Sequence, residues 1–536
     1  MSRLLFKHGS VWTADPSCPR AEALLTEGDR ILRVGREADL EGLATADTRT
    51  IDLGGALILP GFIDCHTHFL KGGYALSRIR LRDVTGRESF AERVAAKAAE
   101  LKKGEWILDG HWDHEQFSPP GLPDRTWIDG ASPENPVCVH RYDLHTVLVN
   151  SLALRIGGIT KDTFSPEGGE IRKDPRTGEP TGILQDAAVE LVTRHIPKPS
   201  RKADLDAAAA ALRHAAGLGV TSVHDMSDAS SFAVYRDLLE AGRLTARVSV
   251  YLPIAEMDAF DPSTIRAPVD GDMVRIAGMK GFADGGLGSH SAYFFEPYAD
   301  DPDTRGYLSS EMFPEGIMEE RILKADAAGL QVAVHAIGDK ANALVLDIYG
   351  RVLARNGARD RRWRIEHAQH LRPAEIARIG VLGAIPSVQP YHAVAEARWV
   401  EKRVGKDRAR TTYVFRSLLE GGGRLAFGSD WPVAPLDPLV GIHAAVTRQT
   451  ADGANPLGWH PDQRIPLEEA LLAFTRNGAR AEFMENAKGS IEPGKLADLV
   501  ALDRDILSLE PERIKDARVT MTVVGGHVVY DALSRS

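Results

Sequence analysis

The stretch "GFIDCHTHFL", residues 61–70, places two histidines two positions apart at the end of an apolar run introduced by Pro60. Alternate side chains of a β-strand point to the same face, so His66 and His68 are expected to point together. Two converging imidazoles are the beginning of a metal site. A lone His-x-His pair is about as often an ordinary polar strand end, so the remaining strands are needed to decide.

Short β-branched runs of this kind alternate along the chain with helical stretches rich in Ala, Leu and Glu. Such alternation is typical of βα units with a parallel sheet covered by helices. The runs begin at residues 61, 136, 219, 274, 330, 362, 383 and 424. Eight of them predict an α/β fold, a (β/α)8 TIM-like barrel.

The two ends of the chain differ from this pattern. Residues 1–60 and 484–536 carry short strand-like pieces without a core-sized apolar helix, and we expect them to build one small β-sandwich domain together. The barrel is then expected over residues 61–483. Within it, "GGEIRKDPRTGEPTGIL", residues 168–184, has two extended runs around a Pro- and Gly-bearing turn. It predicts an inserted hairpin, a candidate lid over the barrel mouth.

The overall composition excludes several classes of protein. The 536 residues carry a net charge of −10 without a basic stripe, which argues against a nucleic-acid partner and gives no reason to expect membrane binding. No apolar run approaches the roughly 20 residues of a membrane span. The three cysteines show no CxxC spacing, so neither a disulfide framework nor a thiolate zinc site is indicated. We expect a cytoplasmic protein with a small-molecule substrate, and a homodimer is compatible with the sequence.

Metal-competent or proton-transfer side chains close five of the eight predicted strands. Barrel enzymes carry their active sites at this end of the strands. Any one of these residues alone is more often structural, but their joint occurrence indicates a metal site. The sequence lacks the GxSxG, HExxH, P-loop and GxGxxG signatures of competing enzyme classes. The set is His66, His68, Lys280, His335, His367 and Asp430.

With these residues in place, the chain resembles the amidohydrolase superfamily and, within it, amidohydrolase family 3, the group that includes N-substituted formamide deformylase. The resemblance extends over nearly the whole chain. It rests on motifs that occur in the family's order: "PGFIDCHTH", "RYDLHTVLVNSLAL", "MKGFADGGLGS", "VAVHAIGDKAN", "RIEHAQ", "PSVQP", "FGSDWPV" and "GSIEPGKLADLVALD".

The resemblance implies a role for each candidate. His66 and His68 would bind a first metal ion, His335 and His367 a second, and Lys280, if carbamylated, would bridge the two. Asp430 would be the proton shuttle. Nitrogen and oxygen donors without thiolate suit zinc, and also Fe, Mn or Ni, and we expect one or two zinc ions. The residues implied around the substrate are Trp112, His145, Gln389 and His392.

These observations predict a metal-dependent hydrolase that cleaves a non-peptide C–N bond, in an amide, N-formyl or carbamate-like group, by metal-activated hydroxide. An esterase or phosphoesterase using the same site stays open, because a metal-activated hydroxide attacks those bonds as well. A non-catalytic ligand-binding barrel is the third alternative. The complete set of candidate ligands argues against it.

Overall fold

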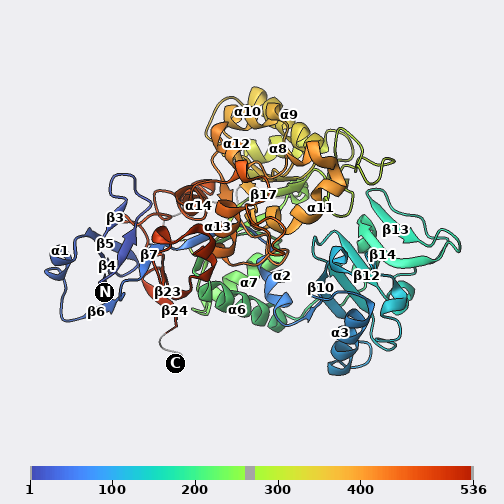
Figure 1. The fold of residues 1–536 in the computed structure, drawn as a ribbon, viewed down its shortest axis with the longest axis horizontal. Coiled ribbons are helices and arrows are strands. Elements are labelled where there is room, and N and C mark those ends of the chain that lie inside the picture. The colour runs from blue at the N-terminus through green and yellow to red at the C-terminus, as the bar shows by residue number, and fades with distance from the viewer. Residues whose placement is uncertain (1–2, 260–271, 533–536) are drawn as a thin grey trace.

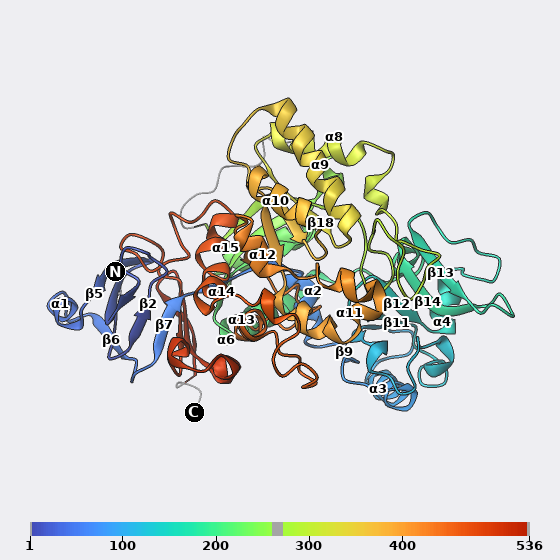
Figure 2. The same ribbon diagram turned by 45° about the horizontal axis from the view of Figure 1, so that its top comes forward.

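The computed structural model describes residues 3–259 and 272–532. Three parts follow one another along the longest axis (Figure 1): a β-rich part that holds both chain ends, a central barrel, and a second sheet with helix α3. The same order is seen in the turned view of Figure 2. Within the described ranges, the structure contains no helix long and apolar enough to cross a membrane.

The central part is a barrel of eight parallel strands, nearly closed. Between its first and last strands, the Asp430 backbone N–H donates to the carbonyl of His66 at 2.7 Å, and that of His68 to the carbonyl of Trp431 at 2.8 Å. Strands such as "QVAVHA" are buried on both faces, which explains their continuous apolar character. In sheet order the strands are β21 (Ala426–Phe427), β20 (Ile385–Val388), β19 (Arg364–His367), β18 (Gln331–Ala336), β17 (Val274–Phe282), β16 (Arg247–Pro253), β15 (Val220–Met226) and β8 (Phe62–Thr67).

Helices follow the barrel strands and cover the sheet from outside (Figure 2). In α9 the buried side chains include Ala341, Val345 and Val352, a spacing that lays one apolar stripe against the barrel. These helices are α2 (Phe69–Ala75), α6 (Arg201–Gly217), α7 (Ala229–Glu240), α8 (Ile317–Ala327), α9 (Asp339–Asn356), α10 (Pro373–Leu382), α11 (Pro390–Ala409), α12 (Phe415–Glu420), α13 (Pro438–Thr447), α14 (Leu467–Ala473) and α15 (Arg476–Ala481).

One of the eight predicted barrel strands is wrong. The run beginning at residue 136 forms β11 (Val137–Arg141), which pairs with neighbours in the second sheet and not in the barrel. The barrel strand that was not predicted is β16, which lies between β15 and β17. β11 is almost completely buried, so its apolar run has the same appearance in sequence as a barrel strand.

The second sheet is inserted between barrel strands β8 and β15. Helix α3 (Arg87–Glu100) packs Phe90 and Val94 into its hydrophobic core, and α4 (Ser151–Ile156) and α5 (Glu190–Thr193) follow its later strands. The last two strands form an antiparallel pair in the stretch where a hairpin was predicted. The strand order is β13 (Gly169–Lys173), β14 (Pro180–Asp186), β12 (Thr146–Val149), β11, β10 (Ile107–Trp112) and β9 (Ile79–Arg80).

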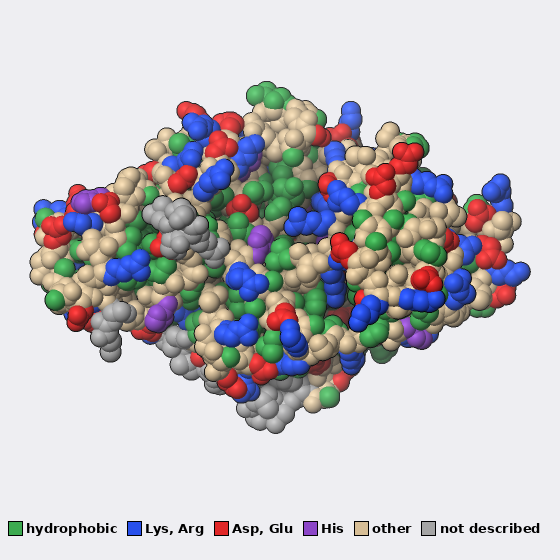
Figure 3. Space-filling model, turned by 90° about the horizontal axis from the view of Figure 1, so that it is seen from below, with side chains coloured by type: hydrophobic (Ala, Val, Ile, Leu, Met, Phe, Trp, Pro, Cys, Tyr) green, Lys and Arg blue, Asp and Glu red, His purple; other side chains and the backbone are tan. Residues whose placement is uncertain are grey.

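The β-rich part contains two sheets whose buried residues form one core. One sheet has the order β5 (Arg30–Gly35), β4 (Ala23–Glu27), β1 (Arg3–Lys7) and β6 (Thr48–Asp52), with α1 (Glu37–Glu41) beside it. The other joins strands from both chain ends, in the order β24 (His527–Asp531), β23 (Val519–Val524), β22 (Leu499–Leu502), β7 (Leu57–Pro60), β2 (Ser10–Trp12) and β3 (Arg20–Ala21). On the face shown in Figure 3, acidic and basic side chains are interspersed with apolar ones.

Candidate metal centre

Four of the predicted histidines and the predicted aspartate line one cavity of about 260 Å³ at the carboxyl ends of the barrel strands. His66 lies on β8 and His68 follows it directly, His335 lies on β18, His367 ends β19, and Asp430 follows β21. Parallel strands bring their carboxyl ends to one rim, which is why residues up to 364 positions apart in sequence meet here.

The side chains converge on Asp430. Its Oδ1 lies 3.5 Å from Nε2 of His66 and 3.3 Å from Nε2 of His68. The ring centroids of His66 and His367 are 5.0 Å apart, and those of His335 and His367 are 4.5 Å apart. The five side chains therefore form one compact cluster.

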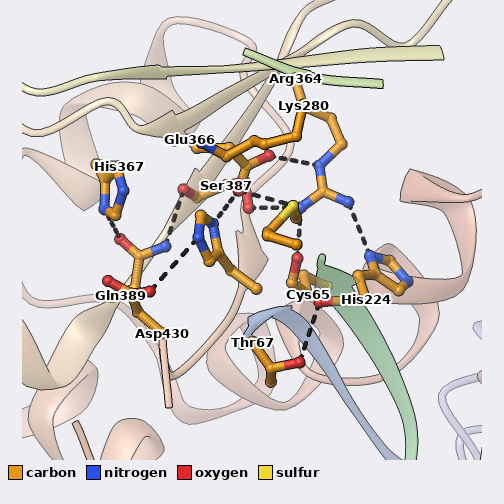
Figure 4. A network of polar contacts seen from close by, with 12 residues as sticks. Cys65, Thr67, His224, Lys280, Arg364, Glu366, His367, Ser387, Gln389 and Asp430 are labelled. Atoms are coloured by element: carbon orange, nitrogen blue, oxygen red, sulfur yellow. Dashed lines mark hydrogen bonds and ion pairs between the residues drawn. The ribbon is translucent and has the colours of Figure 1, made fainter. Parts of the chain in front are cut away.

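Each of the four imidazoles donates one N–H to an acceptor behind it. In every case the acceptor is a carbonyl or carboxylate oxygen, so the histidine must be the donor and its other nitrogen keeps a lone pair for a metal ion. Figure 4 shows this pairing for His367 and Gln389. The bonds are His66 Nδ1 to Glu366 Oε2 (2.5 Å), His68 Nδ1 to the Met226 carbonyl (3.1 Å), His335 Nε2 to the Gly285 carbonyl (3.2 Å) and His367 Nδ1 to Gln389 Oε1 (2.8 Å).

Glu366 is a functional candidate that the sequence analysis missed. Its carboxylate is fully buried and lies between His66 and Arg364, whose Nε donates to Oε1 at 2.7 Å. Burial alone would raise the pKa of Glu366, but the charge of Arg364 and the hydrogen bond from His66 hold it well below the usual range. Arg364 in turn donates to Ser387 Oγ at 3.0 Å and contacts Nδ1 of His224 at 2.8 Å (Figure 4). The available signal was strand alternation, which puts residues 364 and 366 on one face.

Asp430 is held in an unusual backbone conformation. Its φ is 60°, in the left-handed region that non-glycine residues seldom adopt. The neighbouring Ser429 N–H donates to Asp64 Oδ1 at 3.0 Å, which fixes this turn against β8. Burial opposes ionisation of Asp430, but His66, His367 and His68 keep the pKa of its carboxyl well below the usual value. The residue is therefore an anion in this cluster.

Lys280 is near the cluster but does not line the same cavity. It lies on β17 and borders an adjacent cavity of about 490 Å³ that shares His68 and Phe282 with the first. Its Nζ is 3.5 Å from the centroid of the Phe282 ring and 3.3 Å from the Gly281 carbonyl. Burial lowers the pKa of the amine to about 8. About one tenth of the amine is then neutral at pH 7, and this is the form that reacts with CO2.

Of the four predicted substrate residues, His145 and His392 line the metal cavity. Gln389 lies behind His367 as the acceptor described above. The assignment of Trp112 is wrong, because this residue is fully buried in the core of the second sheet. Its indole N–H already donates to the Val139 carbonyl at 2.9 Å, so it offers nothing to a ligand.

His145 carries a positive charge. Its Nδ1 lies 2.8 Å from Asp186 Oδ1, and Tyr307 donates its hydroxyl to the other carboxylate oxygen of Asp186 at 2.5 Å. Burial alone would lower the pKa of His145, but Asp186 and the charges of Asp143 and Asp284 raise it to about 9. The ring centroid is 5.7 Å from that of His335, which places this cation beside the metal ligands.

Two further acidic residues support the cavity and were also missed. Asp284 accepts the backbone N–H groups of Ile337 and Gly338 at 3.0 and 2.8 Å, and so holds the loop after β18. Glu396 lines the cavity one helical turn after His392 on α11. Its i+4 spacing was a signal in the sequence, whereas nothing in the spacing of Asp284 pointed to its role.

The residues present fit a divalent metal ion. The ligand atoms of His66, His68 and Asp430 lie within 4.8 Å of one another, as do those of His367, His392 and Asp430. Asp430 Oδ1 and His392 Nε2 are buried and find no hydrogen-bond partner among the described residues. Imidazole nitrogens and a carboxylate oxygen are a donor set that zinc and related ions accept.

Comparison with known proteins agrees with this geometry. The profile of the amidohydrolase family matches residues 49–530. Protein LONG AFTER FAR-RED 3 of Arabidopsis thaliana is 40% identical over 98% of this chain and 91% of its own length. N-substituted formamide deformylase of Arthrobacter pascens is 27% identical over 99% of both chains.

A solved structure, an uncharacterized metal-dependent hydrolase from Pyrococcus furiosus, superposes with a TM-score of 0.73 at 30% identity. It covers 95% of this chain and 100% of its own. The barrel, the clustered histidines and the family match over most of the sequence lead to one conclusion: the chain belongs to the amidohydrolase family.

Proposed function

We propose that this protein hydrolyses a non-peptide C–N bond, in an amide, N-formyl or carbamate-like group, with a divalent metal ion. The observation that carries the proposal is the set of four histidines around Asp430, each with one nitrogen fixed by a hydrogen-bond acceptor, which leaves the lone pair of the other nitrogen for a metal ion. The similarity to N-substituted formamide deformylase supports the choice of a C–N bond.

His66, His68, His335 and His367 would hold the metal, with zinc as the first choice, and Lys280 would join them as a carbamate. A bound divalent ion would polarise the substrate carbonyl and acidify a water molecule. Asp430 is an anion within the cavity, so it can accept a proton from the attacking water and deliver it to the leaving nitrogen.

His145 supplies a positive charge close to the position proposed for the substrate carbonyl. With Nδ1 occupied by Asp186, its Nε2–H is free to donate to the carbonyl oxygen as negative charge develops there. His392 has a pKa lowered to about 4 by burial, so it enters the reaction as a neutral imidazole. Of two histidines beside the same cavity, one is thus a cation and the other neutral, as set by their surroundings.

A substrate panel tests the proposal. Purified protein, with its metal content measured, is assayed with N-substituted formamides, amides, carbamates, carboxylic esters and phosphoesters. We expect metal-dependent release of amine from at least one member of the first three classes. Turnover confined to esters or phosphoesters would show that the protein is an esterase or phosphoesterase and does not cleave C–N bonds. The absence of both metal and turnover would refute the proposal.

A further inference from the structure

A second cavity, of about 660 Å³, lies beside the metal cavity. Its walls come from the second sheet, from the loop that follows β17, and from α11. Gly288 lines both cavities. Asp143 lines the metal cavity and its ion-pair partner Arg141 lines the second, so this pair crosses the wall between them.

Two buried donors at the second cavity are unused. Arg141 and Thr146 line it and are 1% and 2% exposed. Arg141 Nη1 is bound to Asp143, and its Nε donates to His114 Nδ1 at 3.2 Å. Arg141 Nη2 and Thr146 Oγ1 have no hydrogen-bond partner in the part of the chain that the structure describes. A buried donor left unpaired is costly. β11 and β12 pair antiparallel with His140 opposite Val147, so residues 141 and 146 are cross-strand neighbours and one group is expected to satisfy both donors.

The loop between the cavities is shaped around this guanidinium. A Cβ at position 288 would lie 2.1 Å from Arg141 Nη1 and 2.6 Å from Nη2. Any side chain there would displace an arginine that Asp143 and His114 hold in place. Glycine at 288 therefore leaves room for the guanidinium of Arg141 at a position that lines both cavities.

The charges around the second cavity are balanced. Four basic and four acidic side chains line it. The buried Arg403 pairs with Glu115 at 2.7 Å and also with Asp300, so these two carboxylates are already matched. His114 has a pKa lowered to about 2 by burial and by Arg141 and Arg403, so it is neutral. The choice of ligand in this cavity then depends on the unpaired donors of Arg141 and Thr146 and not on the net charge of the walls.

We infer that the second cavity binds the part of the substrate remote from the scissile bond, by an oxygen acceptor received by Arg141 Nη2 and the Thr146 hydroxyl. The acceptor is a carboxylate or a carboxamide oxygen. This inference rests on the proposed function in that it places the other end of the same molecule in the metal cavity. Binding of the acceptor alone needs no metal.

The variant Thr146→Val tests the inference because it keeps the shape of the side chain and removes only an unpaired hydroxyl. Thr181→Val is the matched control, since Thr181 lines the same cavity but its hydroxyl already donates to the Arg172 carbonyl at 3.1 Å. Arg141→Lys is a second variant that retains a charge for Asp143 and withdraws Nη2.

The probes are formamides with two to six methylenes ending in a carboxylate, a carboxamide or a methyl group. Thr146→Val is expected to raise KM for the first two about tenfold, with kcat unchanged, and to leave the methyl-ended series and the melting temperature unchanged or improved. Arg141→Lys is expected to raise the same KM values, and Thr181→Val to leave them at the wild-type level. Equal KM changes for all three end groups, or none, would overturn the inference.

Glutarate binding to metal-depleted protein, measured by calorimetry, separates this inference from the proposed function. Glutarate is expected to bind wild type and Thr181→Val alike and to bind Thr146→Val about tenfold more weakly. If glutarate behaves so while no formamide is hydrolysed, the site stands and the proposed reaction fails. The site is refuted if formamides are hydrolysed but glutarate does not bind. It is also refuted if glutarate binds Thr146→Val as tightly as wild type.

Discussion

Glu366 Oε2 lies 2.5 Å from Nδ1 of His66, and the guanidinium of Arg364 holds the same carboxylate from the other side. The contact fixes the proton of His66 on Nδ1 and directs Nε2 toward Asp430. Glu366 is therefore a positioning residue for His66.

Replacing Glu366 with Gln is expected to weaken metal affinity about 10- to 100-fold, because an amide neither orients nor polarises His66 as a carboxylate does. The measurement is a competitive titration with a metal chelator. Glu482→Gln is the control, since Glu482 is equally buried and paired with Arg275 and Lys488 but does not touch His66. Equal metal affinity for wild type and Glu366→Gln would contradict the positioning role.

The pair of His145 and Asp186 predicts a pH-dependent contribution to stability. The pKa of His145 is raised to about 9 in the folded protein, against about 6.5 in an unfolded chain. The charged pair therefore stabilises the fold fully below pH ~6.5, and this contribution disappears as the pH rises through 9.

Asp186→Asn tests that prediction, because Asn has the size and shape of Asp and replaces it in the same backbone conformation, with φ of 46° and ψ of −121°. The free energies of unfolding of wild type and variant, from urea titrations of metal-depleted protein, should differ most near pH 6 and converge by pH 10. A difference that stays constant over this range would show that His145 does not carry the charge.

Lys280 is expected to become a carbamate when metal is bound. Its pKa of about 8 leaves some neutral amine to react with CO2, and its Nζ contacts the Phe282 ring and the Gly281 carbonyl. Metal-loaded protein in ¹³C-bicarbonate should show a carbamate carbon signal that Lys280→Met lacks. Identical spectra for the two proteins would restrict Lys280 to a structural role.

The rim of the barrel could be predicted from the sequence because parallel strands end on one side. His66, His335 and His367 each close a β-branched run, and that feature alone placed them together. Gln389 also lies at a strand end, but only the structure shows that its amide oxygen accepts the N–H of His367.

Long-range contacts were beyond the sequence pattern. β11 and β16 are both short, apolar and buried, so no local signal tells which one belongs to the barrel. Trp112 was placed at the substrate by resemblance, yet strand alternation turns it into the core of the second sheet. Asp284 holds backbone groups of other segments, a role that depends on loop geometry and leaves no spacing to detect.

The most direct test compares Asp430→Asn with His66→Ala in a single measurement of bound metal and turnover on whichever panel substrate wild type hydrolyses. Asp430→Asn removes the proton acceptor but keeps the size of the side chain and one oxygen that can still contact a metal ion, so turnover should fall about 10²- to 10⁴-fold while metal and melting temperature are largely retained. His66→Ala removes a ligand and should lose metal as well as turnover. Near-wild-type turnover by metal-bound Asp430→Asn would contradict the mechanism, and full metal retention by His66→Ala would contradict the metal centre.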